Sequence, residues 1–245
     1  MKPRIPRAPA RGERTAVLLL SGGLDSATCL ALAARWRWRV HALSFDYGQR
    51  HAVELAAARR LAARFGAASH RVVAIPDLGA LGGSALTDRS LYVPKSALGA
   101  APIPITYVPA RNTVFLAFAL AAAEVSAATE MVIGANALDY SGYPDCRPAF
   151  LRAFERVARL GTKAGIEGAR ISVRAPLLAM SKAEIAGLSL ALGLAPEETV
   201  SCYDPSAAGE PCGSCDACLL RARGFAEARD VVARPEEPGR RRTGS

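Results

Sequence analysis

Short apolar runs alternate with longer segments of helical periodicity along this chain. The first run, residues 17–20, is continuously apolar and ends at two glycines, which is typical of a buried parallel strand that meets a glycine turn. Further strand-like runs occupy residues 40–45, 70–75, 130–134 and 171–173, and helical patterns occupy residues 27–36, 50–65, 112–128, 147–160 and 181–192. Because strands and helices alternate, we predict an α/β fold with a doubly wound parallel sheet.

Two of the predicted helices carry clear end signals. Gly66 directly follows residues 50–65 and is the favoured type of helix stop. Ser181-Lys182-Ala183-Glu184 has the form of a capping box, in which Ser181 accepts from a backbone N–H and Glu184 reaches back to the cap. We therefore predict that the last of these helices begins at Ser181 and closes at Leu192-Gly193.

One internal segment and both chain ends depart from the alternation. Prolines and glycines multiply over residues 76–109 and the periodicity is lost, so we expect a functional lid or an excursion near the active site. Residues 1–14 and 231–245 are compositionally biased and are predicted to be disordered tails. The remainder divides into an α/β domain at 15–195 and a C-terminal segment at 196–230.

The net charge of +9 over 245 residues suggests nucleic-acid binding until the charge is located along the chain. Residues 1–14 hold five basic residues and one acidic residue (net +4), and residues 234–245 hold four basic and two acidic residues (net +2). The remaining +3 fits an enzyme that handles anionic nucleotides and is weak support for binding a whole tRNA. We therefore do not expect nucleic acid as a partner.

Membrane insertion and secretion are also not expected. The most apolar stretch, residues 113–123, is broken by Glu124 and is shorter than the about 20 residues that a membrane span needs. The basic amino terminus lacks the apolar core and cleavage site of a signal peptide. We expect a cytoplasmic protein that does not contact a membrane.

Residues 21–26 lie between a predicted strand and a predicted helix, where backbone N–H groups and the positive helix end favour an anion. Gly22 and Gly23 lack Cβ, so they can take positive φ and let phosphate oxygens approach, while the Ser21 and Ser26 hydroxyls add donors. Asp25 would repel a bare pyrophosphate, so we expect it to hold Mg²⁺ or to cap the helix.

An ordinary strand-to-helix turn with a capping Ser or Asp is the alternative interpretation of this segment. The kinase-type Gly-x-x-x-x-Gly-Lys-Ser/Thr loop and the dinucleotide pattern Gly-x-Gly-x-x-Gly are both absent. The string Ser-Gly-Gly-x-Asp-Ser instead resembles the pyrophosphate (PP) loop of the ATP pyrophosphatases. That resemblance implies adenylation of a substrate oxygen with release of pyrophosphate.

Four cysteines crowd the C-terminal segment with the spacing C-x9-C-x2-C-x2-C; they are Cys202, Cys212, Cys215 and Cys218. Four thiolates satisfy a tetrahedral Zn²⁺ completely, so we predict a structural zinc ion, one per chain, that pins this segment. Unpaired buried cysteines and an iron–sulfur cluster are the alternatives. Zinc is favoured over the cluster because the remainder of a ferredoxin pattern is missing.

Several separated strings together resemble one family, the 7-cyano-7-deazaguanine synthases (QueC family) of queuosine precursor biosynthesis. The strings occupy residues 21–28, 46–51, 108–112, 134–148, 181–184, 201–203 and 211–222, and the resemblance covers roughly residues 15–226. Ala110 is one departure, since the family usually has Gly there. The resemblance implies an adenine nucleotide alpha hydrolase-like fold with a small zinc-bearing helical segment, and a homodimer.

The resemblance also implies which residues form the ATP site, with ATP and Mg²⁺ bound at the loop after the first strand. The expected ATP-binding residues are Leu18, Leu19, Leu20, Ser21, Gly22, Gly23, Leu24, Asp25, Ser26, Ala27 and Thr28, and the expected catalytic residues are Ser21, Asp25, Ser26 and Arg111. Arg111 begins a predicted helix after a turn, where its guanidinium could contact a phosphate or the substrate carboxylate. The alternative is a surface arginine beside an Asn cap.

A guanine-like substrate would suit the polar segment 139–147. A carboxylate can accept from ring N–H groups, a tyrosine can stack on the ring, and an arginine can pair with a carboxylate on it. A polar loop that caps a helix is the alternative. The expected substrate-binding residues are Tyr47, Arg111, Asp139, Tyr143, Asp145 and Arg147.

The family resemblance implies an ATP-dependent ligase that converts 7-carboxy-7-deazaguanine and ammonia to the 7-cyano compound. Two alternatives use the same features differently. A tRNA-modifying PP-loop enzyme, such as a tRNA thiolase, would need a basic face and a reactive cysteine pair near the loop. A non-enzymatic zinc module would bind nucleic acid through the basic tails.

Overall fold

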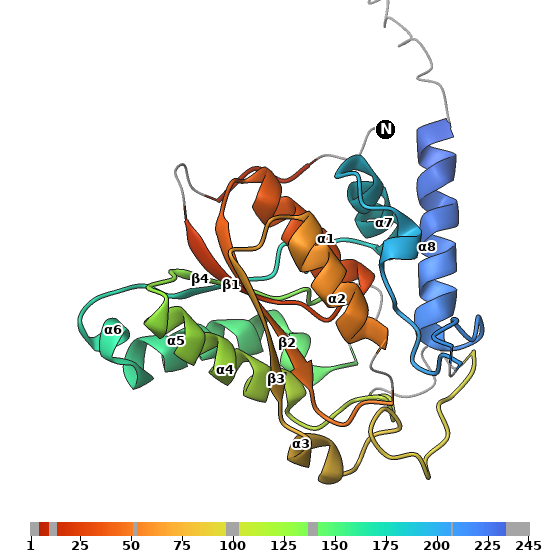
Figure 1. Cartoon of the computed structure of the whole chain (residues 1–245), viewed down its shortest axis with the longest axis horizontal. Helices are drawn as coiled ribbons and strands as arrows, with labels where there is room; N and C mark the ends of the chain where they lie inside the picture. The colour runs from red at the N-terminus through yellow and green to blue at the C-terminus, as the bar shows by residue number, and fades with distance from the viewer. Residues whose placement is uncertain are drawn as a thin grey trace, which may run out of the picture.

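The computed structural model describes residues 5–9, 14–50, 53–96, 103–136, 142–206 and 208–233 (Figure 1). Five strands form one parallel sheet in the order β3-β2-β1-β4-β5. They are β1 (Thr15–Leu19), β2 (Arg39–Asp46), β3 (Ser69–Ala74), β4 (Glu130–Val132) and β5 (Ser172–Arg174). The five predicted strands and the parallel sheet are thereby confirmed.

Five helices match the predicted ones: α1 (Leu24–Arg35), α2 (Val53–Arg64), α4 (Arg111–Val125), α5 (Pro148–Gly161) and α7 (Lys182–Ala191). The short helices α3 (Asp77–Ala80), α6 (Lys163–Ile166), η1 (Pro144–Cys146) and η2 (Pro196–Glu198), and the long α8 (Asp216–Ala233), had no predicted bounds. The capping box at the start of α7 is confirmed, because the Ser181 hydroxyl accepts from Glu184 N and Ser181 N donates to the Glu184 carboxylate.

Each face of the sheet has its own hydrophobic core, which is the physical meaning of a doubly wound fold. Successive side chains of a strand point to opposite faces, so Leu18 packs in the core under α1 and α7. Leu19 packs on the other face against Leu116 of α4. Figure 1 shows α1, α2 and α7 on one side of the sheet and α4 and α5 on the other.

The strand order reverses at β1, which pairs with β2 on one side and with β4 on the other. In open α/β sheets ligands bind at the carboxyl edge of such a reversal. Gly134 follows β4 there and lies against the start of α1: an added Cβ would come within 2.8 Å of Ser26 N. The absence of a side chain at Gly134 thus lets the turn after β1 settle over the end of β4.

Part of the segment 76–109 lies against the cysteines. Arg50 fastens this segment, since its Nη2 donates to Asp88 O at 2.8 Å and also to Leu91 O. Ala85 packs with Cys215 and Cys218 in one buried cluster. The segment is therefore an excursion that covers the cysteine group.

The structure describes only part of each predicted tail. In the predicted amino-terminal tail, Ile5 packs against the core and Pro6 O accepts from Trp36 Nε1 at 3.0 Å, so this part of the tail is in contact with the domain. The predicted carboxyl-terminal tail lies outside the described residues from 234 onward, and its first three residues belong to α8. Among the described residues, every helix is too short or too polar to cross a membrane.

Candidate active site

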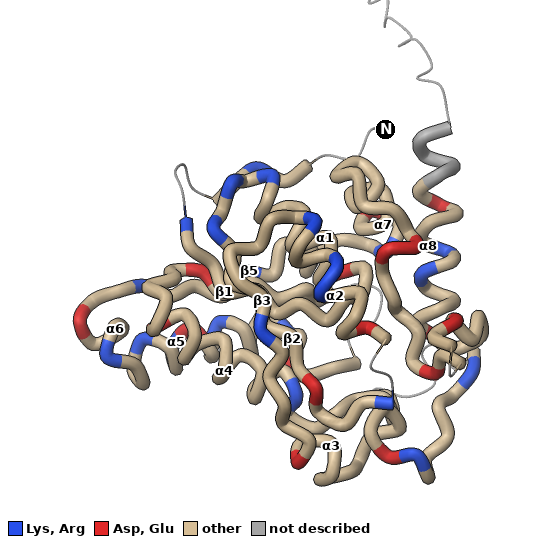
Figure 2. Tube along the Cα trace, viewed as in Figure 1, with Lys and Arg blue, Asp and Glu red and all other residues tan. Residues whose placement is uncertain are grey.

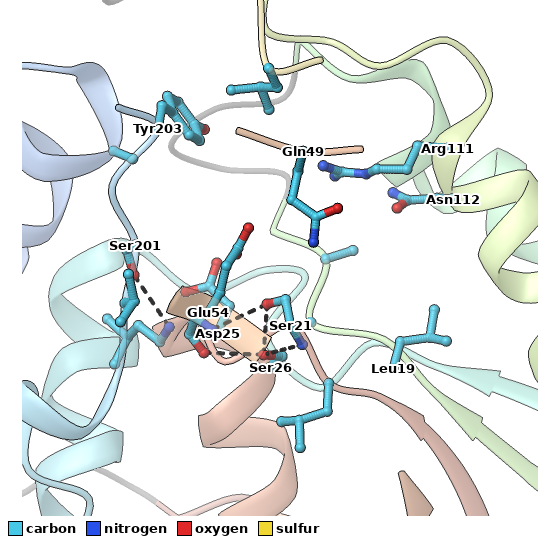
Figure 3. Close-up of a pocket in the computed structure, with 18 of the residues that line it drawn as sticks. Leu19, Ser21, Asp25, Ser26, Gln49, Glu54, Arg111, Asn112, Ser201 and Tyr203 are labelled. Carbon is cyan, nitrogen blue, oxygen red and sulfur yellow. Dashed lines mark hydrogen bonds between the residues drawn. The ribbon is translucent and has the colours of Figure 1, made fainter. Parts of the chain in front are cut away.

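A cavity of about 330 Å³ opens at the carboxyl ends of β1, β2 and β4, a size in the range of small-ligand pockets. Its lining comes from the turn after β1, from α2 and α4, and from the segments that carry Lys182, Ser201 and Arg221. Figure 3 shows Arg111 and Asn112 on one side of the cavity, Ser201 and Tyr203 on the other, and Ser21, Asp25, Ser26 and Glu54 between them.

The turn between β1 and α1, residues 21–26, is tightly wound by its own hydroxyl groups; we call it the phosphate loop. Ser26 Oγ accepts from Ser21 N at 3.2 Å and lies 3.0 Å from Ser21 Oγ. Ser21 Oγ in turn accepts from Gly23 N at 3.2 Å. These bonds hold both hydroxyls and the amino end of α1 at the cavity, the arrangement that suits an anion.

Gly22 is the position in the loop that only glycine can fill. Its φ is +87°, and an added Cβ would lie 2.2 Å from the carbonyl oxygen of Glu54. Gly23 differs from the prediction, because its φ is −78°. It precedes α1 in an extended conformation and accepts from Ala27 N at 3.0 Å, so it serves as the helix cap residue and does not need positive φ.

Asp25 is paired with a lysine from a distant part of the chain. Lys182 Nζ lies 2.9 Å from both carboxylate oxygens of Asp25, and both side chains are half-buried at the cavity. Of the two sequence hypotheses for Asp25, capping of α1 is replaced by this ion pair. The pair brings one anion and one cation to the mouth of the phosphate loop.

Glu54 contributes a second carboxyl group to the same cavity from the first turn of α2. Within the described ranges no side chain hydrogen-bonds its carboxylate. Burial raises the pKa of Glu54 from 4.5 to about 7, and the Arg111 cation opposes that rise. The cavity thus contains a carboxyl group that titrates close to neutral pH.

The wall opposite Ser201 is formed by Arg111 and aromatic side chains. Arg111 is the first residue of α4 and lies beside Tyr47, whose ring meets that of Phe115 edge-on with 5.5 Å between centroids. Tyr143 lines the cavity as well, and its hydroxyl lies 2.9 Å from Thr106 Oγ1. A guanidinium beside two aromatic rings can bind a planar, negatively charged ring system.

The four C-terminal cysteines converge on one point. The Sγ atoms of Cys202, Cys212, Cys215 and Cys218 all lie within 4.8 Å of one another, and none forms a disulfide. Backbone N–H groups of Asp204 and Cys212 each lie 3.3 Å from Cys202 Sγ. Four converging thiols that accept N–H donors have the form of a closed tetrathiolate metal site.

The chain matches the family model described as "Queuosine biosynthesis protein QueC" over residues 15–229. The chain belongs to the QueC family. Two relatives named 7-cyano-7-deazaguanine synthase are similar to it throughout. One, from an Anaeromyxobacter species, is 61% identical over 221 residues, which is 89% of this chain and 94% of the relative. The other, from Thiobacillus denitrificans, is 61% identical over 210 residues, 86% and 92% of the two chains.

Solved structures resemble the chain more loosely. The structure of NMN synthetase from Francisella tularensis has a TM-score of 0.46 and 15% identity, and the match covers 88% of this chain and 86% of that one. The close relatives therefore define the QueC assignment.

Not every residue assigned to the ATP site from the QueC resemblance lines the cavity. Leu19, Leu20, Ser21, Gly23, Leu24, Asp25 and Ser26 do. Leu18 and Ala27 are fully buried in the core between the sheet and α1, and the buried Thr28 hydroxyl donates to Leu24 O at 2.7 Å. Leu18, Ala27 and Thr28 thus support the loop from the core. Gly22 belongs to the loop itself but faces α2.

The six residues assigned to the substrate separate in a similar way. Tyr47, Tyr143 and Arg111 line the cavity, and Asp139 lies outside the described residues. Asp145 is buried and accepts from Asn112 N at 3.0 Å, so it caps the amino end of α4, as the polar-loop alternative proposed. Arg147 is exposed next to the start of α5 and is not part of the lining.

The residues that line the cavity but were not assigned to it from sequence include Glu54, Lys182, Ser201 and Arg221. Lys182, Ser201 and Arg221 belong to strings that carry the family resemblance, and Glu54 is the first acidic residue after the string 46–51. For Lys182, Ser201 and Arg221, the position in a family-like string was the available signal. Their convergence on the phosphate loop depends on the fold.

Proposed function

We propose that this protein is an ATP-dependent carbon–nitrogen ligase that converts 7-carboxy-7-deazaguanine and ammonia to 7-cyano-7-deazaguanine. The observation that carries the proposal is the phosphate loop, whose serine hydroxyls and helix end face a cavity that also contains Arg111 and two tyrosines. The names of the relatives supply the identity of the product.

The chemistry begins with a carboxylate, from which hydroxide is a poor leaving group. Attack of a carboxylate oxygen on the α-phosphorus of ATP gives an acyl adenylate and releases pyrophosphate. Ammonia then attacks the acyl carbon, the C–O bond to AMP breaks, and loss of a proton gives the primary amide. In this step the enzyme holds the two reactants in contact, which replaces a bimolecular encounter.

The nitrile requires a second activation at the amide oxygen. Attack of that oxygen on a second ATP releases another pyrophosphate and leaves an adenylated imidate. Loss of AMP together with the remaining N–H protons forms the carbon–nitrogen triple bond. One site can run both activations, because each places a carboxyl-derived oxygen against the α-phosphorus of an ATP molecule bound at the same loop.

The phosphate loop would bind the departing pyrophosphate through the Ser21 and Ser26 hydroxyls and the amino end of α1. Lys182, now 2.9 Å from Asp25, would turn toward the phosphates when ATP enters. Asp25 would then be available to hold Mg²⁺, which when bound neutralises phosphate charge. The carboxylate of the substrate would lie against Arg111, with Tyr47 beside its ring.

Zinc is the metal we propose for the cysteine cluster. Thiolate sulfurs prefer soft or borderline ions, and a tetrahedral site with four thiolates leaves no open position for chemistry. We expect metal analysis to find one zinc ion per chain, and a Cys218→Ser variant to lose it. Retention of stoichiometric iron with visible absorbance would contradict the assignment.

A tRNA thiolase is the alternative, and the described cysteines argue against it. Thiolases of this kind would need a reactive thiolate, yet burial raises the pKa of Cys29 far above its usual value and raises the pKa of Cys146 to about 11. Basic and acidic residues share α5 and α8 (Figure 2). Exposed Arg35, Arg37 and Arg39 lie at the amino end of β2, opposite the cavity.

The direct test supplies purified protein with 7-carboxy-7-deazaguanine, ATP, Mg²⁺ and ammonium. We expect the nitrile by mass spectrometry, with two AMP formed per nitrile. An Asp25→Asn variant should lose this activity, whereas Asp77→Asn, which alters an exposed aspartate on α3, should retain it. A wild-type protein that leaves the carboxylate unchanged would refute the proposal.

A homodimer follows from the same family resemblance and is proposed with the function. Exposed apolar residues on α4, α5 and α6, among them Val125, Leu160 and Ile166, provide a surface that a second copy could cover. Sedimentation analysis should give twice the mass of the 25.7 kDa chain. A single species at the chain mass over the micromolar range would contradict the dimer.

A further inference from the structure

The phosphate loop is held by a segment that belongs to the cysteine region. Val200 N donates to Gly22 O at 3.0 Å. The Ser201 hydroxyl accepts from Leu24 N, the first N–H of α1, at 3.3 Å. Two neighbouring residues thus hold the loop at Gly22 and Leu24, and the next residue along the chain is the metal-ligand candidate Cys202.

Arg221 fixes this gripping segment from α8. Its Nη1 donates to Ser201 Oγ at 3.2 Å and to Thr199 Oγ1 at 2.8 Å, and its Nη2 donates to Pro196 O. The guanidinium also lies over the ring of Phe225, 5.2 Å from its centroid. A guanidinium with several fixed partners is rigid, because its planar fork has little freedom left.

The cysteine cluster forms a second link between α8 and the segment that holds the phosphate loop. Cys202 follows Ser201 directly, and Cys218 lies on α8 one turn before Arg221. A metal ion held by both cysteines would therefore fix α8 relative to the segment that grips the loop. The same helix presses on the lysine partner of Asp25, since a Cβ at Gly224 would come within 2.8 Å of Lys182 Cγ.

We propose that Ser201 and Arg221 are positioning residues for the phosphate loop, and that through them a metal ion at the four cysteines raises the affinity of the protein for ATP. The ATP part of this inference rests on the proposed function. The metal then does more than fix the C-terminal segment. Its loss loosens the amino end of α1, and the nucleotide dissociates.

The first experiment compares Ser201→Ala with Ser201→Thr, which keeps the hydroxyl. Binding of a non-hydrolysable ATP analogue is measured by calorimetry, and hydrogen exchange is measured at the amides of residues 22–24. Loss of one hydrogen bond should weaken binding about 5-fold in Ser201→Ala and speed exchange in the loop, while Ser201→Thr behaves as wild type. Zinc content should stay unchanged in both variants.

Arg221→Met should have the larger effect, about 10-fold or more on the affinity for the analogue, because a charged donor with three partners is lost. Arg223→Met is the matched control on the same helix, since Arg223 is exposed and pairs with Glu227. The Michaelis constant for ATP should rise in Arg221→Met more than that for the carboxylate substrate, a split that general destabilisation would not produce.

The second experiment removes the metal with a chelator under reducing conditions, with circular dichroism as a check that the fold persists. Wild type should lose loop protection and analogue affinity, and Ser201→Ala should lose less, since its link to the loop is already broken. Equal losses in both proteins, or unchanged loop exchange in Ser201→Ala, would overturn the inference. Loop exchange is measured without substrate, so a failure to make the nitrile would be a separate result against the proposed function.

Discussion

The two sides of the cavity are built in different ways. The phosphate loop consists of six consecutive residues whose mutual hydrogen bonds join positions two to five apart. The residues that contact this loop from other elements, here called the wall, come from distant parts of the chain. Lys182 pairs with Asp25, 157 positions away, and the Ser201 hydroxyl accepts from Leu24 N, 177 positions away. A local motif can be recognised in sequence, whereas a wall of this kind exists only after folding has brought its parts together.

Substitution of Gly22 should have the largest effect, because Gly22 lies where the phosphate loop contacts Glu54 of α2. Gly22→Ala forces a residue with a side chain to adopt a φ of +87° and drives its Cβ against Glu54 O. We expect a loss of about 3 kcal/mol in the free energy of unfolding and no measurable ATP binding. Chemical denaturation and calorimetry measure both.

Gly66→Ala is the matched control for that substitution. Gly66 has a similar φ of +65° but nothing within 4 Å of an added Cβ, so it should lose only about 1 kcal/mol and keep ATP binding. Equal losses for the two variants would mean that backbone conformation, and not the contact with Glu54, makes Gly22 necessary.

Lys182→Met tests the wall and should have the next largest effect. Removal of one cation that stabilises developing charge typically lowers the rate of reaction about 100-fold or more. We expect this loss in pyrophosphate release with little change in the melting temperature. Lys163→Met, on an exposed ion pair of α6, should be indistinguishable from wild type. Full activity in Lys182→Met would remove the lysine from the mechanism.

Glu54 lines the cavity next to the phosphate loop. The effect of its substitution on stability should depend on pH. The pKa of Glu54 is raised from 4.5 to about 7 in the folded protein, so folding favours the protonated form. Its contribution to stability is present below pH 4.5 and is lost as the pH rises through about 7. At pH 8 Glu54→Gln should be more stable than wild type by on the order of 1 kcal/mol.

Urea denaturation at several pH values measures this difference, which should vanish in acid. Glu227→Gln, at an exposed ion pair on α8, should show no comparable dependence. A wild-type protein that gains stability relative to Glu54→Gln as the pH rises would show that the carboxylate is paired, contrary to the contacts around it.

Ala110→Gly should give the smallest effect, and it should stabilise the protein. Ala110 precedes α4 with a φ of +53°, a conformation that disfavours residues with a side chain. Glycine removes that strain, but it also makes the unfolded chain more flexible, so we expect a net gain of about 0.5–1 kcal/mol. A lower melting temperature in Ala110→Gly would contradict this account of the family departure.

The central strand β1 was predictable because it is a short apolar run that is buried on both faces. The edge strands β3 and β5 are only partly buried, and their apolar character is weaker. The sequence could not decide which glycine of the phosphate loop needs positive φ, since both lack a side chain. Glu54 O decides in favour of Gly22, and that contact comes from another helix. Lys182 shows the same limit. The capping box around it could be predicted from sequence, but its ion pair with Asp25 could not.

Asp145 shows why substrate contacts were the least predictable part of the site. An aspartate in a polar turn can bind a ligand or cap a helix, and the amino-acid composition of the turn is the same in both cases. Asp145 accepts from the N–H of Asn112 of α4, which lies 33 positions earlier in the chain. Its capping role does place Arg111 at the cavity, so Asp145 acts on the site through α4.

The central claim is that one loop activates two oxygens of the same carboxylate by adenylation. The most direct measurement supplies substrate whose carboxylate carries oxygen-18 at both positions and follows the label by mass spectrometry. The account predicts that each nitrile is accompanied by two molecules of AMP, each with one labelled oxygen. Label in orthophosphate, together with ADP as the nucleotide product, would contradict it.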